Sequence, residues 1–191
     1  MNLYALALDS VLSDPRAARD HATSVEYKDE PGPQGVTYPT ISSDVPPGAR
    51  AEIERALAGV FGPVTVNRDL LRLSTESARA PYWAHTDRWM GSEYTALLYL
   101  TAPADCRGGT GIVEHKRTGL RFAPRNIGEE AVWRRDTNDP DKWTIVTFIP
   151  MRFNRLFVFR SNLIHAASPG FGSTAADGRL VLVTFFSPRR V

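Results

Sequence analysis

A chain of 191 residues with 42% hydrophobic and 10% aromatic residues can bury the core of one compact domain, which we expect to span residues 1–191. The formal net charge of +2 argues against a dedicated nucleic-acid binder, which carries a strongly basic surface. A single cysteine, Cys106, excludes an internal disulfide, and no stretch approaches the roughly 20 apolar residues that cross a membrane. With no secretory signal pattern at its start, the protein is expected to be cytoplasmic.

Residues 1–63 are expected to form a helical N-terminal support. Ser13-Asp14-Pro15 supplies a capping side chain and an early proline, so a helix is predicted over residues 16–27. Residues 31–48 are dense in proline, glycine and serine, and are predicted to form a long surface connection. Over residues 49–60 the apolar side chains recur at amphipathic helical spacing, which predicts a second helix.

Beyond Pro63 the chain consists of short runs rich in valine, leucine, phenylalanine and tyrosine. Strands are predicted at residues 64–74, 81–87, 94–101, 109–117, 143–149, 155–160 and 179–186. The polar segment 121–142 is expected to be a long loop with at most a short helical turn. The last strand is apolar at both alternating sets of positions, so both of its faces should be covered. These elements predict a mainly β sandwich or jelly roll over residues 64–188, with the helices packed on one outer face.

One pattern indicates a metal site. His85-Thr86-Asp87 places an imidazole and a carboxylate two residues apart, and in an extended strand such side chains project from one face and can reach one ion. His165, which follows the apolar run at residues 156–159, is the natural third ligand. Two histidines and one carboxylate with open positions are the ligand set of non-haem iron(II) oxygenases, so we expect iron(II) here.

Arg179 opens a strand that is otherwise apolar. Turn-forming residues fill the segment 168–178, so a hairpin would bring Arg179 to the same mouth of the barrel as His165. A guanidinium among buried apolar neighbours needs an anion, because an unpaired buried charge is costly. The far carboxylate of a dicarboxylate co-substrate would supply that anion to the planar guanidinium.

His85-x-Asp87, His165 and Arg179 together resemble the iron(II)- and 2-oxoglutarate-dependent oxygenase superfamily. The run at residues 95–101 and the following Gly108-Gly109-Thr110 look like its prolyl-hydroxylase-like branch, and the likeness extends over residues 64–188. The sequence also resembles a group of small bacterial and phage-associated proteins of unassigned function, which share the Gly-Gly-Thr-Gly segment and the run at residues 152–156.

The resemblance implies a double-stranded β-helix (jelly roll, cupin-like) that uses iron(II), 2-oxoglutarate and dioxygen. It also implies that Tyr99 donates a hydrogen bond to the far carboxylate of 2-oxoglutarate beside Arg179. Where the family often has a second tyrosine, this chain has Ser74-Thr75, so Thr75 is the substitute contact. The implied reaction is hydroxylation with release of succinate and carbon dioxide, since Asp87 occupies the position where halogenating relatives leave room for halide.

Two other functions remain open, a non-catalytic metal- or ligand-binding jelly roll and an oxygenase that acts on a nucleobase. The favoured substrate is an amino acid, a peptide or another small molecule, and no membrane partner is expected. Trp89 and Arg88 follow the metal motif and are candidates for contact with the substrate, although tryptophans in a small jelly roll more often pack. His115 is a competing ligand, but its charged neighbours Glu114 and Lys116 indicate a polar outer face.

Overall fold

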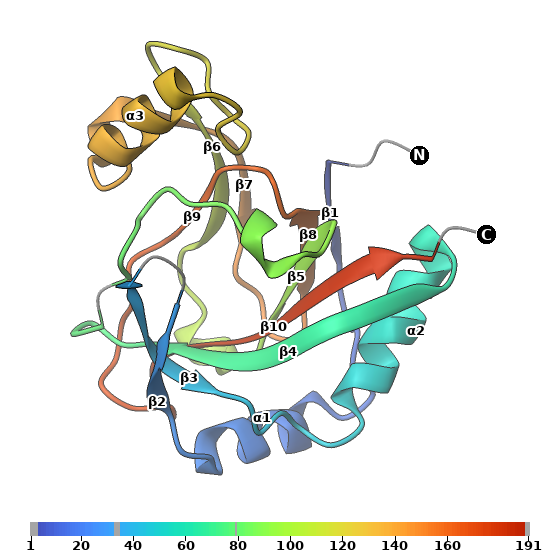
Figure 1. The fold of residues 1–191 in the computed structure, drawn as a ribbon. Coiled ribbons are helices and arrows are strands. Elements are labelled where there is room, and N and C mark those ends of the chain that lie inside the picture. Colours follow the sequence, from blue (N-terminus) through green and yellow to red (C-terminus); the bar gives the residue numbers. More distant parts are fainter. Residues whose placement is uncertain (1–3, 33–34, 79, 190–191) are drawn as a thin grey trace.

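The computed structural model describes residues 4–32, 35–78 and 80–189, and over these residues the protein is mainly β with two antiparallel sheets (Figure 1). The helices are α1 (Pro15–Ser24), α2 (Ala49–Phe61) and α3 (Ile127–Asp136), with short 3-10 helices η2 (Arg88–Met90), η3 (Pro103–Asp105) and η4 (Pro140–Lys142). The strands are β1 (Ala5–Leu8), β2 (Lys28–Pro31), β3 (Thr37–Ser42), β4 (Val64–Ser74), β5 (Tyr94–Tyr99), β6 (Gly109–His115), β7 (Trp143–Pro150), β8 (Leu156–Arg160), β9 (His165–Ala167) and β10 (Arg179–Pro188). None of the helices in the described part of the chain has the length and apolar character that membrane crossing requires.

The larger sheet has the strand order β1-β8-β5-β10-β4-β3-β2. Its central strand, β10, pairs with β4 on one side and with β5 on the other. Val181 lies opposite Arg72 of β4 and Tyr99 of β5. Buried side chains cover both faces of β10, as the apolar pattern of this strand predicted.

Helices α1 and α2 cover one face of this sheet, on the outer side of β4 in Figure 1. Asp14 caps α1 by accepting a hydrogen bond of 3.0 Å from the Ala17 amide. Ile53 and Leu57 of α2 are fully buried in a cluster that also contains leucine and valine side chains of β4, β5, β8 and β10. Burial of each such side chain contributes about 1.5–3 kcal/mol, so this contact holds the helices on the sheet. The predicted packing of the N-terminal helices on one face is therefore confirmed.

The opposite face of the larger sheet is the inner face, and it carries a second buried cluster. Phe157, Phe159, Val181 and other inner-face side chains contact Ile112 of the smaller sheet, whose strand order is β7-β6-β9. The pairing of β6 with β7 requires a close approach, because a side chain at Gly109 would meet the carbonyl oxygen of Ile149 at 2.1 Å. The absence of a side chain at Gly109 therefore lets β6 pair with β7. This pairing fixes the position of the next residue, Thr110.

The N-terminal segment 1–63 contributes more than the helical support that we expected. β1 pairs with β8, and β2 and β3 extend the larger sheet beyond β4. β3 lies within residues 31–48, which were predicted to be a connection, because its pairing comes from β4 rather than from its own alternation. Helix α1 ends at Ser24 and not at residue 27. Tyr27 lies beyond the helix, and its hydroxyl donates a hydrogen bond of 2.6 Å to the Ala22 carbonyl in the last turn.

Two predictions for the segments around the smaller sheet were wrong. Residues 121–142 contain the ten-residue helix α3, whose first turn is capped by Asn126 accepting a hydrogen bond of 2.9 Å from the Glu129 amide. Residues 81–87 form no strand, and only one isolated bridge, between His85 and His165, pairs them with the sheet. η2 begins directly after Asp87, which ends the extended backbone.

His115 does not lie on a polar outer face. It is 1% exposed, and its Nε2 lies 3.0 Å from Asp136 Oδ2 at the end of α3, while its Nδ1 lies 2.8 Å from the Thr118 hydroxyl. The expected outer face is covered because α3 packs there. His115 therefore anchors α3 and lies outside the set of possible metal ligands in the described residues.

Candidate metal centre

The three predicted ligands lie together. His85, Asp87 and His165 each offer a ligand atom, and these atoms all lie within 4.8 Å of one another. His165 Nε2 is 3.5 Å from Asp87 Oδ2, and the centroids of the two imidazole rings are 4.3 Å apart. Two nitrogen donors and one carboxylate therefore face one point, as the sequence pattern predicted.

Backbone hydrogen bonds bring these side chains together. The His85 amide donates to the His165 carbonyl at 3.0 Å, and the His165 amide donates to the His85 carbonyl at 2.9 Å. The Asp87 amide donates to the Ser161 carbonyl at 2.8 Å, just beyond the end of β8. The segment 85–87 is thus tied to the segment 161–165 by main-chain contacts, and the ligand positions need no metal to be set.

The imidazoles are oriented for metal binding. His85 Nδ1 lies 3.2 Å from the Trp83 carbonyl oxygen, and His165 Nδ1 lies 3.1 Å from the Leu163 carbonyl oxygen. Because a carbonyl can only accept, these contacts assign the proton to each Nδ1 and leave each Nε2 with a free lone pair. Burial, together with the neighbouring His165, lowers the pKa of His85 to about 3, so this ring is neutral near pH 7.

Asp87 is oriented by two hydroxyl groups. The Thr95 hydroxyl donates a hydrogen bond of 2.9 Å to Asp87 Oδ2, and the Thr95 and Ser161 hydroxyls lie 3.0 Å apart. Thr95 and Ser161 are buried, at 0% and 1% exposure. This chain of hydroxyls fixes the rotamer of the carboxylate, which is the usual function of partners behind a metal ligand.

Arg179 lies buried at the start of β10, with 3% of its surface exposed. Its Nη2 donates a hydrogen bond of 3.3 Å to the Thr110 hydroxyl, which also accepts a bond of 2.9 Å from the Tyr99 hydroxyl. Its Nε has no hydrogen-bond partner among the described residues. Burial lowers the pKa of Arg179, and the groups that oppose this shift include Tyr99 but no carboxylate. The guanidinium is therefore a desolvated cation whose anion has to come from a ligand.

The metal ligands and Arg179 share one cavity of about 790 Å³. Its wall includes His85, Asp87, His165, Arg179 and Thr110, and apolar side chains of the inner face of the larger sheet complete it. A volume of this size holds a small dicarboxylate together with a further small molecule.

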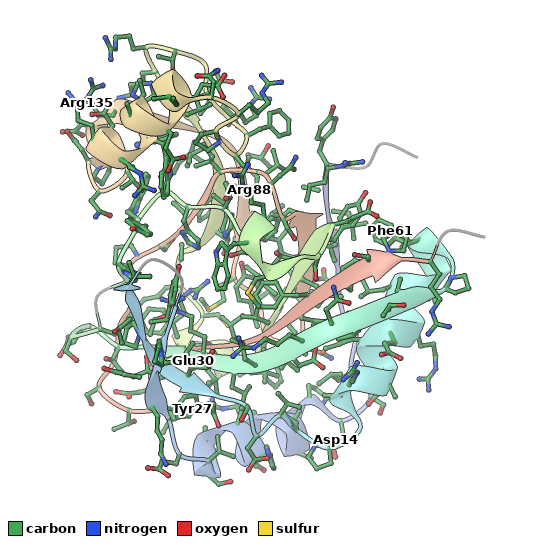
Figure 2. The ribbon with its side chains drawn as sticks, viewed as in Figure 1. Asp14, Tyr27, Glu30, Phe61, Arg88 and Arg135 are labelled. Carbon is green, nitrogen blue, oxygen red and sulfur yellow. The ribbon has the colours of Figure 1, made fainter. Side chains whose placement is uncertain are left out.

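The other residues proposed from the sequence occupy different places. Tyr99 lies beside Arg179, with the guanidinium 5.9 Å from its ring centroid, but behind the cavity wall. Thr75 does not line the cavity, and its hydroxyl lies 3.1 Å from that of Ser77. Trp89 lines the cavity and is 45% exposed. Arg88 (Figure 2) does not line it, because its Nη1 donates a hydrogen bond of 3.1 Å to the Pro124 carbonyl.

Sequence reasoning missed three residues of the site. Thr110 was noted within the Gly-Gly-Thr segment, but no role was assigned to it. Thr95 was noted as part of a strand and of the run at residues 95–101, but no role was assigned to it. Arg72 is the third, and its signal was an arginine between the apolar residues Leu71 and Leu73, at a position that lines the cavity.

Several solved structures are similar to this chain. AviO1 from Streptomyces viridochromogenes Tue57 is 18% identical, with a TM-score of 0.59 over 96% of this chain and 89% of that chain. SnoN, a non-heme alpha-ketoglutarate-dependent epimerase from nogalamycin biosynthesis, is 16% identical, with a TM-score of 0.58 over 95% of this chain and 76% of its own. HygX from Streptomyces hygroscopicus, with nickel and 2-oxoglutarate bound, is 14% identical, with a TM-score of 0.60 over 96% of this chain and 82% of its own. At these identities the likeness establishes the fold.

At the level of sequence, the model of a family described as "Family of unknown function (DUF6445)" matches residues 2–186. No curated protein matches the chain.

Proposed function

We propose that this chain, which belongs to the family of unknown function DUF6445, is an iron(II)- and 2-oxoglutarate-dependent oxygenase. One observation carries the proposal. The His85-Asp87-His165 cluster and a buried arginine that has no anionic partner among the described residues line the same cavity. A site that only bound metal would not need Arg179, whereas a co-substrate with two carboxylates needs both features.

The residues fit iron(II). Two imidazole Nε2 atoms and one carboxylate are the donors of non-haem iron(II) oxygenases, and this set leaves positions open toward the cavity. Hydrogen bonds at both Nδ1 atoms and at Asp87 Oδ2 hold the donors in place.

The residues also fit 2-oxoglutarate. Arg179 would hold its far carboxylate through the planar guanidinium, whose Nε has no described partner. The Thr110 hydroxyl accepts hydrogen bonds from Arg179 and Tyr99, so its own proton is free to be donated to that carboxylate. Tyr99 acts on the co-substrate by holding Thr110 and Arg179 in place.

When bound, iron(II) and 2-oxoglutarate would supply the electrons that activate dioxygen, the oxidant, with succinate and carbon dioxide as co-products. The chain itself fixes the donors, clamps the co-substrate and keeps water out. Leu97, Val181 and Phe185 supply the apolar wall that excludes water from the centre.

Hydroxylation of an amino acid, a peptide or another small molecule is the proposed outcome, supported by the intact Asp87. The similar structure of SnoN belongs to an epimerase, so the product analysis has to include stereochemical inversion. The proposal includes a double-stranded β-helix (jelly roll) of the prolyl-hydroxylase-like kind, supported by Tyr99 beside Arg179, and a single domain over residues 1–191. It also includes a cytoplasmic location, supported by the free thiol of Cys106.

Anaerobic titration of the purified protein with iron(II) and 2-oxoglutarate tests the cofactor assignment. We expect a visible charge-transfer band in the wild type and its loss in His165→Ala and Arg179→Met. Admission of oxygen with a panel of small molecules and peptides should then stimulate succinate release. Metal binding without the band in the wild type would favour the non-catalytic jelly roll, and succinate release stimulated only by nucleobases would favour the nucleobase oxygenase.

A further inference from the structure

A second arginine faces the cavity. Arg72 on β4 lies opposite Val181, two residues before Ser74, which is paired with Arg179. Because alternate residues of a strand share a face, Arg72 and Ser74 both project to the inner side of the sheet, and both line the cavity. The guanidinium carbon of Arg72 lies 5.7 Å from the centroid of the Tyr38 ring.

No carboxylate among the described residues lies within ion-pair distance of Arg72. Arg68, four residues earlier on the same face, forms an ion pair with Glu30 of β2, whose position is labelled in Figure 2. For Arg72, burial lowers the pKa, and the largest opposing influence is the charge of Asp87, which belongs to the metal cluster. Arg72 is therefore a desolvated cation that pairs with none of the carboxylates in the described part of the chain.

The proposed cofactors do not neutralise it either. The charges of iron(II) and Arg179 are balanced by Asp87 and the two carboxylates of 2-oxoglutarate. The positive charge of Arg72 is then left in the cavity, while the carboxylate of Glu76 lies on its exposed rim. One unbalanced guanidinium matches a ligand with one negative charge.

The wall beside Arg72 is apolar and aromatic. Tyr38 and Trp89 stack with their ring centroids 5.9 Å apart and an angle of 23° between the rings. Leu70 and Met90 extend this wall. A ligand that reaches Arg72 from the metal centre therefore has an apolar body that covers these side chains.

We propose that the substrate of this site is a small carboxylic acid with an apolar body, whose carboxylate is held by Arg72 and whose body lies against Tyr38 and Trp89. The proposal rests on the proposed function, because it assigns to the substrate the part of the cavity that 2-oxoglutarate leaves free. Arg72 acts as a substrate-positioning residue, since it sets which end of the substrate lies away from the metal.

The test uses matched probes and protein loaded with nickel(II) and 2-oxoglutarate, which does not turn over. The probes are 3-phenylpropanoate, its neutral amide and 2-phenylethyl phosphate, and quenching of tryptophan fluorescence reports binding, since Trp83 and Trp89 line the cavity. We expect the acid to bind about 10-fold or more tightly than the amide, which is the range of a charge-assisted hydrogen bond. Arg72→Met should bind both equally, and Arg72→Lys should retain part of the preference.

Arg55→Met is the matched control, because it removes the same charge from an exposed position on α2 and should keep the full preference. Thermal melting should show that Arg72→Met is at least as stable as the wild type, since a desolvated charge is removed and its apolar stem is kept. An Arg72→Met variant that still prefers the acid would overturn the proposal. Loss of 2-oxoglutarate binding in that variant, which would place Arg72 in the co-substrate clamp, would also overturn it, and so would tightest binding of the phosphate.

Failure of the proposed function gives a different result. If the wild type formed no complex with nickel(II) and 2-oxoglutarate, the same probes would be titrated into the unloaded protein. A preference for the acid that depends on Arg72 would then support a carboxylate site without the proposed co-substrate, and its absence would overturn the site itself.

Discussion

His85 and His165 exchange both of their backbone hydrogen bonds, at 3.0 and 2.9 Å, although 79 positions of the chain separate them. This single bridge aligns the two imidazoles with their ring centroids 4.3 Å apart. Because main-chain atoms make the bridge, replacement of either side chain leaves the connection intact. The site is therefore preorganised, and ligand side chains can be removed without loss of the fold.

We expect His165→Ala and Asp87→Ala to weaken metal binding by about 100-fold or more, because each change removes one of three donors. Anaerobic calorimetry with iron(II), or with cobalt(II) as a substitute, measures the loss. His21→Ala is the control, since His21 lies on α1 and pairs with Asp44 at 3.0 Å. Circular dichroism should show an unchanged fold in all three variants, and full metal affinity in His165→Ala would contradict the assignment.

Thr95→Val should lower metal affinity by about 10–100-fold, although Thr95 touches no metal. The valine has nearly the same shape but cannot donate to Asp87 Oδ2, so the carboxylate loses the hydroxyl that fixes its rotamer. The same exchange at Thr144, which is exposed on β7, is the control and should leave the affinity unchanged. Equal metal affinity in the two variants would show that Asp87 is oriented by other contacts.

Arg179→Met should raise the dissociation constant for 2-oxoglutarate by about 100-fold or more and leave metal binding intact, because in the proposed site the guanidinium binds the co-substrate and not the metal. Tyr99→Phe and Thr110→Val should each raise it by roughly 3- to 30-fold, since the first removes one and the second removes two hydrogen bonds of the cluster around Arg179. Calorimetric titration of the metal-loaded protein separates the two effects. A parallel loss of metal affinity in Arg179→Met would instead indicate a disturbed cavity.

The metal cluster was predictable because its signal is local chemistry. His85-x-Asp87 needs only an extended backbone at two positions to place both side chains on one side, and a single bridge supplies it. Arg179 was predictable because a cation in a strand covered on both faces must meet an anion. The structure places the three possible ligands and Arg179 in one cavity even though residues 81–87 form no strand.

The missed features depend on long-range partners. β3 gains its stability from β4, and α3 is held by contacts with residues far away in the sequence. Trp133 Nε1 donates a hydrogen bond of 2.8 Å to the Ala84 carbonyl, so α3 braces the residue before His85. The charged neighbours of His115 suggested solvent, and only the packing of α3 shows that this histidine is buried. Such contacts leave no pattern within a short window of sequence.

The contact between His115 and Asp136, which anchors α3, should depend on pH. A hydrogen bond from Arg135, whose position on α3 is labelled in Figure 2, and a further contact with His115 lower the pKa of Asp136 to about 2. A carboxyl whose pKa is lower in the folded than in the unfolded protein stabilises the fold above the unfolded value, which is near 4. This stabilisation is lost as the pH falls from about 4 toward 2.

We therefore expect the unfolding midpoint of the wild type in urea to fall over this pH range, and the fall to be smaller in Asp136→Ala. At pH 7 the variant should be less stable by about 1–3 kcal/mol, because His115 is left buried without its Nε2 partner. Asp141→Ala, at an exposed position in η4, is the control and should follow the wild type. Identical pH profiles for Asp136→Ala and the wild type would mean that Asp136 titrates alike in the folded and unfolded states. In that case His115 and Asp136 do not hold α3 against the sheet.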